Sequence, residues 1–226
     1  MLDVSTVIPI LITANKSGAG KDFTANYITN YFEIVPVQDR VKVEAVKVSI
    51  VAGMKEIAAD LFGYLGVKRA TFYEVFRKSR NQVLSGTDGK TVVDLWVALG
   101  SFARDLHEDV WINAFVKRLH VEGQKYDSKE FPKFEEPFSR VLLVCAPDWR
   151  FNHELQYVRQ RYPNVLTIHI TSEIDVKEQG LDDKVTVTDF DWQIHNDKTD
   201  QFKIQLMRMC QEIRERVQVL APSVEV

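Results

Sequence analysis

One segment near the start of the sequence constrains the fold of this chain most. It is a short apolar strand pattern followed directly by a glycine-rich turn and then by a helix. Residues 10–13 form an apolar, β-branched run, which is typical of a buried strand. Residues 15–22 contain Gly18 and Gly20, and from Asp22 onward apolar residues recur near helical spacing. A strand, a glycine-rich loop and a helix in this order form the context that a phosphate-binding loop requires.

Further apolar runs along the chain alternate with helical patterns. The predicted strands cover residues 41–51, 141–146 and 165–170. The predicted helices, each with an apolar face, cover residues 54–65, 95–106, 111–119, 155–161 and 202–217. This alternation predicts an α/β fold with a mostly parallel sheet and helices on both of its faces. In such sheets ligands bind beyond the carboxyl ends of the strands.

The glycine-rich loop carries the groups that hold phosphate. Gly18 and Gly20 allow a tight turn that brings backbone N–H groups onto phosphate oxygens, and Lys21 adds positive charge at the helix start. Asn15 stands where the usual pattern has its first glycine, and asparagine tolerates left-handed backbone angles best among the other residues. We therefore expect phosphate binding to survive this change. The alternative is a glycine-rich turn that merely carries an exposed lysine.

Asp22 replaces the Ser or Thr that usually follows the lysine and whose hydroxyl meets magnesium. A carboxylate at this position can ligate the ion directly or through water. It can also act only on the helix, because negative charge stabilises the first turn. Asp22 is therefore the candidate metal ligand, with the helix-start role as its alternative.

Charge and composition exclude several classes of protein. With 29 basic and 32 acidic residues, the net charge of −3 argues against a surface that coats nucleic acid. The longest stretch without charged residues, residues 4–15, is shorter than the ~18 residues of a membrane span. Asp3 precedes any basic residue, unlike a secretory leader, so we expect a cytoplasmic protein. Cys145 and Cys210 lack metal-ligand spacing and are predicted to be buried free thiols.

Three segments, in the same order, resemble the bacteriophage deoxynucleoside monophosphate kinases. Residues 13–22 are similar to the phosphate loop of that family, in which Asp after the lysine is usual. Residues 104–114 resemble its Arg, short spacer and Asp-Val-Trp segment, and residues 148–154 resemble its Asp-x-Arg-Phe-x-x-Glu segment. Weaker similarities lie at residues 54–56 and 194–197.

The resemblance implies a P-loop kinase-like three-layer fold in a single domain, residues 1–226, with a helical substrate-binding insertion at about residues 53–139. It implies an enzyme that uses ATP and Mg²⁺ to phosphorylate deoxynucleoside monophosphates to diphosphates. The expected partners are small-molecule nucleotides, not a nucleic-acid polymer or a membrane, and a homodimer is left open. If the chain is phage-encoded, the expected location is the host cytoplasm.

Phosphoryl transfer asks a protein mainly for positioning and positive charge. Lys21 is expected to bridge the β and γ phosphates of ATP. Arg104 and Arg150 are the candidates that bring the two anions together, because guanidinium groups bind phosphate oxygens bidentately. For both arginines the alternative is a surface ion pair. A dianionic acceptor phosphate needs no general base.

The other expected substrate contacts have structural alternatives. Asp148 and Glu154 are expected to fix the Arg150 guanidinium or to contact base or sugar, or else to be helix-start carboxylates. Trp111 is expected to stack on a base or to close against the deoxyribose, or else to belong to the core. The expected substrate-binding residues are Lys55, Arg104, Trp111, Asp148, Arg150 and Glu154.

ATP binding is assigned to the phosphate loop, its following residue and one distant position. Asn196 resembles the position at which the family holds adenine. The basic cluster of residues 68–90 is a candidate mobile cover over the phosphates, with a solvated helix face as its alternative. The expected ATP-binding residues are Asn15, Lys16, Ser17, Gly18, Ala19, Gly20, Lys21, Asp22, Phe23 and Asn196.

Two departures from the family pattern put the substrate range in doubt. Residues 50–52 replace an expected Phe-Ala-Asp, and residues 100–102 replace an expected Gly-Thr-Glu. Two other functions therefore stay open. One is a P-loop kinase of another small metabolite, such as the dephospho-coenzyme A type, which requires a base for its hydroxyl acceptor. The other is a nucleotide-binding module without catalysis.

Overall fold

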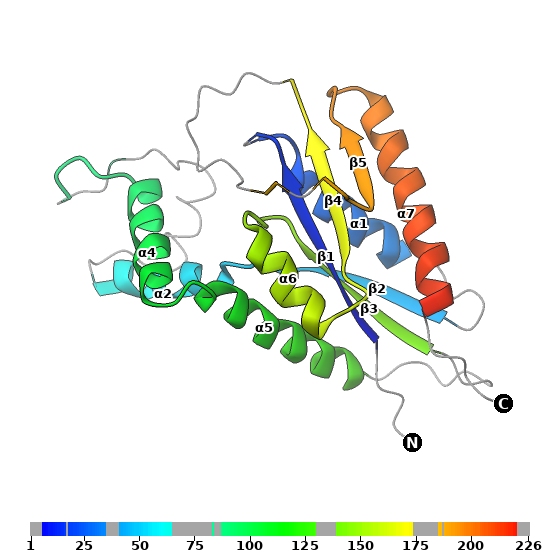
Figure 1. The fold of residues 1–226 in the computed structure, drawn as a ribbon, viewed down its shortest axis with the longest axis horizontal. Coiled ribbons are helices and arrows are strands. Elements are labelled where there is room, and N and C mark those ends of the chain that lie inside the picture. Colours follow the sequence, from blue (N-terminus) through cyan, green and yellow to red (C-terminus); the bar gives the residue numbers. More distant parts are fainter. Residues whose placement is uncertain are drawn as a thin grey trace. The chain divides into compact units, whose positions relative to one another are not determined.

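The computed structural model describes residues 6–16, 18–34, 41–64, 83, 87–129, 139–173, 185–186 and 188–220. Its strands are β1 (Thr6–Ala14), β2 (Val41–Lys47), β3 (Ser139–Ala146), β4 (Leu166–Thr171) and β5 (Trp192–His195). Its helices are α1 (Lys21–Ile34), α2 (Ala52–Tyr64), α4 (Val92–Leu106), α5 (Val110–Asp127), α6 (Asn152–Arg161) and α7 (Asp200–Leu220). Figure 1 shows these elements along the chain.

The chain divides into two compact units. The first unit comprises residues 1–49 and 116–226, and the second comprises residues 50–115. The first unit holds the sheet with α1, α6, α7 and the second half of α5, whereas the second holds α2, α4 and the start of α5.

The five strands form one parallel sheet in the order β2-β3-β1-β4-β5. The central strand β1 pairs with β3 from Thr6 opposite Val141 to Leu11 opposite Ala146. Because every pairing is parallel, the carboxyl ends of all five strands meet at one edge, which we call the carboxyl edge. The loops that follow β1 and β3 are therefore neighbours at that edge.

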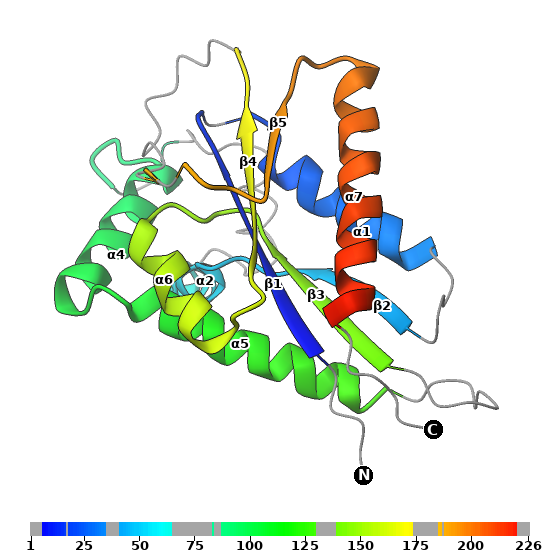
Figure 2. The same cartoon turned by 45° about the vertical axis from the view of Figure 1, so that its right-hand side comes forward.

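Helices cover both faces of this sheet, which gives the first unit three layers (Figures 1 and 2). α1 and α7 contact each other and share one face, where their side chains join those of the strands in a single apolar core. α6 and the second half of α5 lie on the other face. β1 is buried on both sides, since Ile10 and Leu11 are each fully enclosed. The predicted α/β, P-loop kinase-like fold is confirmed.

Both cysteines are buried free thiols, as predicted. Cys145 lies on β3 and Cys210 on α7, and both belong to the core between the sheet and the α1 and α7 helices. Burial in this apolar layer raises the pKa of Cys145 and raises that of Cys210 to about 12.

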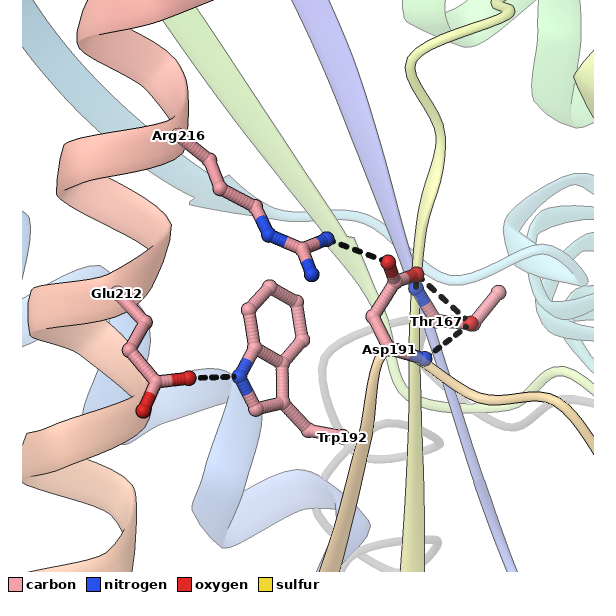
Figure 3. Close-up of polar contacts among 5 residues, drawn as sticks. All are labelled: Thr167, Asp191, Trp192, Glu212 and Arg216. Carbon is pink, nitrogen blue, oxygen red and sulfur yellow. Dashed lines mark hydrogen bonds and ion pairs between the residues drawn. The ribbon is translucent and has the colours of Figure 1, made fainter.

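A polar network fixes β5 to β4 and to α7 at the start of the two strands (Figure 3). The carboxylate of Asp191 accepts hydrogen bonds from the backbone N–H of Thr167 at 2.8 Å and from its hydroxyl at 2.9 Å, and it pairs with the Arg216 guanidinium. That guanidinium also lies over the Trp192 ring, and the indole N–H donates to Glu212 at 2.7 Å. The network anchors a strand too short to hold itself in place.

The second unit is helical and has its own small core. Ala58 and Ala59 of α2 pack with Val92 of α4, together with the half-buried Trp96. α4 begins with a capping box, in which Thr91 and Asp94 exchange hydrogen bonds. These bonds from the Thr91 backbone and hydroxyl lower the pKa of Asp94.

The second unit ends at Phe115, and the helical insertion expected at about residues 53–139 stays a prediction. The second half of α5 belongs to the sheet-containing unit because it packs on the sheet. Gly123 lies so close to β1 that a Cβ there would stand 2.9 Å from a methyl of Val7. Near the end of α5 the buried Tyr126 donates its hydroxyl to the backbone oxygen of Lys42 at 3.4 Å.

Within the residues that the structure describes, no helix is both long enough and apolar enough to cross a membrane.

Candidate functional site

The carboxyl edge gathers most of the residues that the sequence marks for function. The phosphate loop, residues 15–22, follows the central strand β1, and residues 147–151 follow its neighbour β3. On the other side, residues after β4 and β5 reach the same edge. This is the edge at which parallel α/β sheets bind their ligands.

The backbone of the phosphate loop makes the turn that its glycines predict. Gly18 has φ 77° and Gly20 has φ 113°, angles that residues with a Cβ rarely adopt. Ala19 between them is buried, and its N–H points to the oxygen of Lys16 at 3.4 Å. Lys21 is the first residue of α1. The N–H groups at the start of α1 and the Lys21 ammonium thus belong to one short turn, which suits a bound anion.

Asn15 does not adopt a left-handed backbone, so that explanation for its place in the loop is wrong. The described non-glycine residues with positive φ are Asp88 and Lys198. Instead, the Asn15 side chain pairs with the backbone of Ser172, donating to its oxygen at 3.3 Å and accepting from its N–H at 3.1 Å. The Asn15 N–H also donates to the oxygen of Ile170 at 3.1 Å. Asn15 thus prolongs the pairing of β1 with β4 into the phosphate loop.

Asn196 lies at the phosphate loop, where its side chain binds protein backbone. Its amide nitrogen donates to the oxygen of Ala19 at 2.7 Å, and its amide oxygen accepts from the N–H of Lys198 at 3.0 Å. A Cβ on Gly20 would stand only 2.8 Å from the same amide nitrogen. Asn196 therefore fixes the phosphate loop from outside, and its expected contact with adenine stays a prediction.

Asp22 lies in the first turn of α1 with an exposed side chain and a cationic neighbour. One carboxylate oxygen is 2.6 Å from the ammonium of Lys47, the last residue of β2. The same ammonium donates to the side-chain oxygen of Asn26 at 3.2 Å. Among the described residues, no three His, Cys, Asp or Glu side chains gather as a metal site. A Mg²⁺ ion held by one carboxylate and by substrate phosphates requires no such group.

Asp148, two residues after β3, accepts a short hydrogen bond from the hydroxyl of Ser49, just after β2. Next to it, Val48 donates its N–H to the oxygen of Cys145 at 2.9 Å, which continues the β2–β3 pairing. These bonds hold the ends of two neighbouring strands together. They also place the Asp148 carboxylate, half-buried, at the carboxyl edge.

Glu154 is the helix-start carboxylate of α6. It is 2% exposed, and one of its oxygens accepts from the N–H groups of Arg150 and Phe151, each at 3.1 Å. These bonds fix the backbone of Arg150, which is half-buried in the segment between β3 and α6. The geometry thus gives Glu154 the structural role that the sequence left open. Its expected contact with base or sugar stays a prediction.

Lys55, Arg104 and Trp111 all lie in the second unit. The Trp111 side chain is 4% exposed and donates its indole N–H to the oxygen of Gly100 at 3.2 Å, which favours the packing role over stacking on a base. Arg104 reaches the same oxygen at 3.5 Å, and the Lys55 ammonium lies 5.6 Å from the centre of the Trp96 ring. The structure therefore groups Arg104 and Trp111 around one backbone carbonyl.

The remaining expected site residues fall into two groups. Lys16 and Phe23 are exposed at the loop and the first turn of α1, and the Phe23 ring lies 5.8 Å from that of Phe202. Ser17 lies outside the described residues, as does most of the basic cluster of residues 68–90.

Two residues of the site were missed by sequence reasoning. Lys47 ends a strand whose pattern extended the prediction to residue 51, which placed this lysine inside the strand and away from any loop. Ser49 follows it and has no motif of its own. A predicted strand end at residue 47 would have placed both at the carboxyl edge, because β2 is parallel to its neighbour.

Comparisons with known proteins add little to this geometry. No family model matches the chain, and neither does any curated protein. Its fold is similar to a plasmid partition protein from Borrelia burgdorferi, with 10% identity, a TM-score of 0.34 and coverage of 94% of this chain and 100% of that one. A candidate plasmid partition protein from Borrelia burgdorferi B31 bound to AMPPNP gives 10% identity and a TM-score of 0.30, with 92% and 99% covered. Likeness at these TM-scores assigns no function.

Proposed function

We propose that this chain is an ATP- and Mg²⁺-dependent kinase that converts deoxynucleoside monophosphates to diphosphates. The observation that carries the proposal is the pairing of two loops at one sheet edge. The phosphate loop with Lys21 follows the central strand β1, and Arg150 follows the adjacent parallel strand β3. The resemblance to phage deoxynucleoside monophosphate kinases, carried by residues 13–22, 104–114 and 148–154, names the substrates.

The phosphate loop is the proposed donor site. Its glycine turn and the start of α1 direct backbone N–H groups toward one place, which suits the terminal phosphates of ATP. The Lys21 ammonium neutralises charge on the β and γ phosphates as the γ phosphate departs. Asn15 and Asn196 hold the loop in this conformation through their bonds to the Ser172 and Ala19 backbone.

Arg150 is the proposed acceptor-side cation. Its backbone N–H is bound by the buried Glu154, which fixes the point at which the Arg150 side chain leaves the segment after β3. The family resemblance of residues 104–114 also makes Arg104 a candidate for binding the transferring or acceptor phosphate. The acceptor monophosphate is largely dianionic near pH 7 and attacks without a base, since its second pKa is about 6.

Asp22 is the residue proposed to hold Mg²⁺, and its carboxylate fits a hard cation that prefers oxygen ligands. When bound, the ion neutralises charge that develops on the phosphates during transfer. The side chain is 71% exposed at the start of α1, so an ion that arrives with ATP can reach it.

The test is a transfer assay with the full-length chain, ATP and Mg²⁺, offering each of the four deoxynucleoside monophosphates and following the diphosphate by chromatography. We expect at least one diphosphate to form at one ADP per product. Lys21→Met is expected to lower the rate by about a hundredfold or more while the protein stays folded. Lys117→Met, an exposed change on α5, is the matched control and is expected to leave the rate unchanged.

Other outcomes separate the alternatives. ATP binding without transfer to any monophosphate would leave a binding module and remove the kinase. Transfer to a hydroxyl acceptor, with a rate that Asp148→Asn abolishes and a matching pH profile, would indicate a metabolite kinase instead. Full activity in a folded Lys21→Met protein would remove the mechanism.

A further inference from the structure

Lys47 lies at the phosphate site, although no family resemblance or motif points to it. It is the last residue of β2, and its strand partner on β3 is Cys145. Its ammonium reaches across to α1, where it is 2.6 Å from Asp22 and 3.2 Å from the Asn26 side-chain oxygen. Asp22 and Asn26 are four residues apart and therefore lie on one face of the helix.

The two groups that bind the Lys47 ammonium are of the kind that Mg²⁺ also uses. Mg²⁺ prefers oxygen ligands, above all carboxylates, and in nucleotide sites it binds one or two of them together with substrate phosphates. An ammonium is a compact point charge with three donors and occupies such oxygens in a similar way. In the structure the Lys47 ammonium thus contacts the Asp22 carboxylate, which is the group expected to bind Mg²⁺.

The contact is suited to being exchanged. The side chains of Lys47 and Asp22 are 33% and 71% exposed, and ion pairs in water contribute little stability. A divalent ion that is also held by ATP phosphates can therefore displace the ammonium at small cost. Before that exchange the ammonium cancels the charge of Asp22, which would otherwise repel the approaching triphosphate.

We propose that Lys47 is the resident counter-cation of the phosphate site, bound to Asp22 until Mg²⁺ displaces it during ATP binding. This inference rests on the proposed function, because it assumes that the loop binds ATP and that Asp22 meets Mg²⁺. It makes Lys47 a residue that lowers the affinity for the ion and raises the affinity for metal-free ATP.

Loss of Lys47 is expected to weaken the binding of metal-free ATP and to strengthen the binding of Mg²⁺. A purely structural role for Lys47 does not produce this pair of opposite changes in affinity. Isothermal titration of ATP into the full-length chain, in EDTA and then at stepped free Mg²⁺, measures both. For Lys47→Met we expect ATP affinity in EDTA to fall by about threefold, from the size of an exposed ion pair. The free Mg²⁺ at which ATP affinity reaches half of its rise is expected to fall by about threefold as well.

Two further variants make the test specific. In Asp22→Asn the half-saturating Mg²⁺ is expected to rise, and adding Lys47→Met to it is expected to cause no further shift in the half-saturating Mg²⁺. Lys125→Met, which removes an exposed lysine 2.9 Å from Glu122 on α5, is the matched control and should leave both quantities unchanged.

Each result decides the matter. If the wild-type chain binds ATP but Lys47→Met leaves the Mg²⁺ dependence unchanged or raises the half-saturating concentration, the Lys47 role is wrong and the kinase proposal stands. The same holds if the Lys47→Met shift in half-saturating Mg²⁺ persists in Asp22→Asn. If the wild-type chain does not bind ATP under any condition, both the proposed function and this inference are wrong.

Discussion

Two asparagine side chains at the phosphate loop form hydrogen bonds with the backbone, as backbone groups of paired strands do in a sheet. Asn15 offers a donor and an acceptor to Ser172, and Asn196 donates to Ala19 while accepting from Lys198. Asn15 thereby joins the loop to the end of β4, which is next to β1, and Asn196 joins it to the end of β5, one strand further. The loop after β1 is thus held by the segments that follow β4 and β5.

Asn196 can either position the phosphate loop or recognise adenine, and one substitution distinguishes the two roles. If it positions the loop, Asn196→Ala weakens binding of ATP, GTP and inorganic tripolyphosphate alike, by about tenfold for the loss of a partly buried hydrogen bond. If it reads adenine, the variant loses preference for ATP over GTP and binds tripolyphosphate normally. Fluorescence or calorimetric titration with the three ligands distinguishes these results, and we expect the first. Asn164→Ala, in the turn between α6 and β4, is the control.

At the residue scale, the sequence predicted the glycine turn of the phosphate loop better than it predicted the hydrogen bonds that hold the loop. Gly18, Gly20 and Lys21 were placed correctly because a turn between a strand and a helix is a local pattern. The partners of Asn15 and Asn196 lie 157 and 177 residues away along the chain, and no local pattern contains them. The burial of Trp111 and Glu154 likewise depends on packing, so one sequence left their roles open.

Among the elements, those with a continuous apolar face were predicted and the one without was missed. β3 is buried along nearly its whole length and was evident as an apolar run. β5 has four residues that alternate between buried and exposed, too few for periodicity to identify. α5 runs eight residues beyond its predicted end at 119, to Asp127, because its polar second half still places Tyr126 against the sheet.

Because β5 is so short, the network around Asp191 is expected to carry much of its stability (Figure 3). Asp191→Ala leaves the buried N–H and hydroxyl of Thr167 without this acceptor, which should lower the free energy of unfolding by about 1–3 kcal/mol. Urea denaturation followed by circular dichroism measures the change. The nearby exposed Asp189→Ala should change stability by less than about 0.5 kcal/mol. Equal effects of the two variants would contradict the assignment.

At the scale of the whole molecule, the sequence indicated a sheet-containing domain with a helical insertion, and the structure divides into a sheet-containing unit and a helical unit, residues 50–115. The helical pattern of α5 is continuous, so nothing local shows where its contacts change from one unit to the other. The close approach of Gly123 to Val7 does show it, and this contact joins residues far apart in the sequence.

Burial of both thiols gives the folded protein a defined response to alkaline pH. The folded pKa of Cys210 is about 12, against 9.0 for an unperturbed thiol, and that of Cys145 is raised in the same direction. Above pH 9 the unfolded chain therefore loses protons that the folded chain keeps, so the free energy of unfolding falls as pH rises. Urea denaturation at pH 8, 9 and 10 should show this decline, and it should be shallower in Cys145→Ala/Cys210→Ala. An identical slope in that variant would show that other groups cause it.

The most direct test of the central claim is whether one chain binds both nucleotides across the loops that follow β1 and β3. The probe is adenosine joined through five phosphates to thymidine or to another deoxynucleoside, titrated by calorimetry. We predict that one probe molecule binds per chain and that at least one of the four deoxynucleoside probes binds about a hundredfold more tightly than ATP. We also predict that this probe binds about tenfold more weakly to Lys21→Met and to Arg150→Met. The account is contradicted if none of the four deoxynucleoside probes binds more tightly than ATP and if Arg150→Met leaves the affinity for them unchanged.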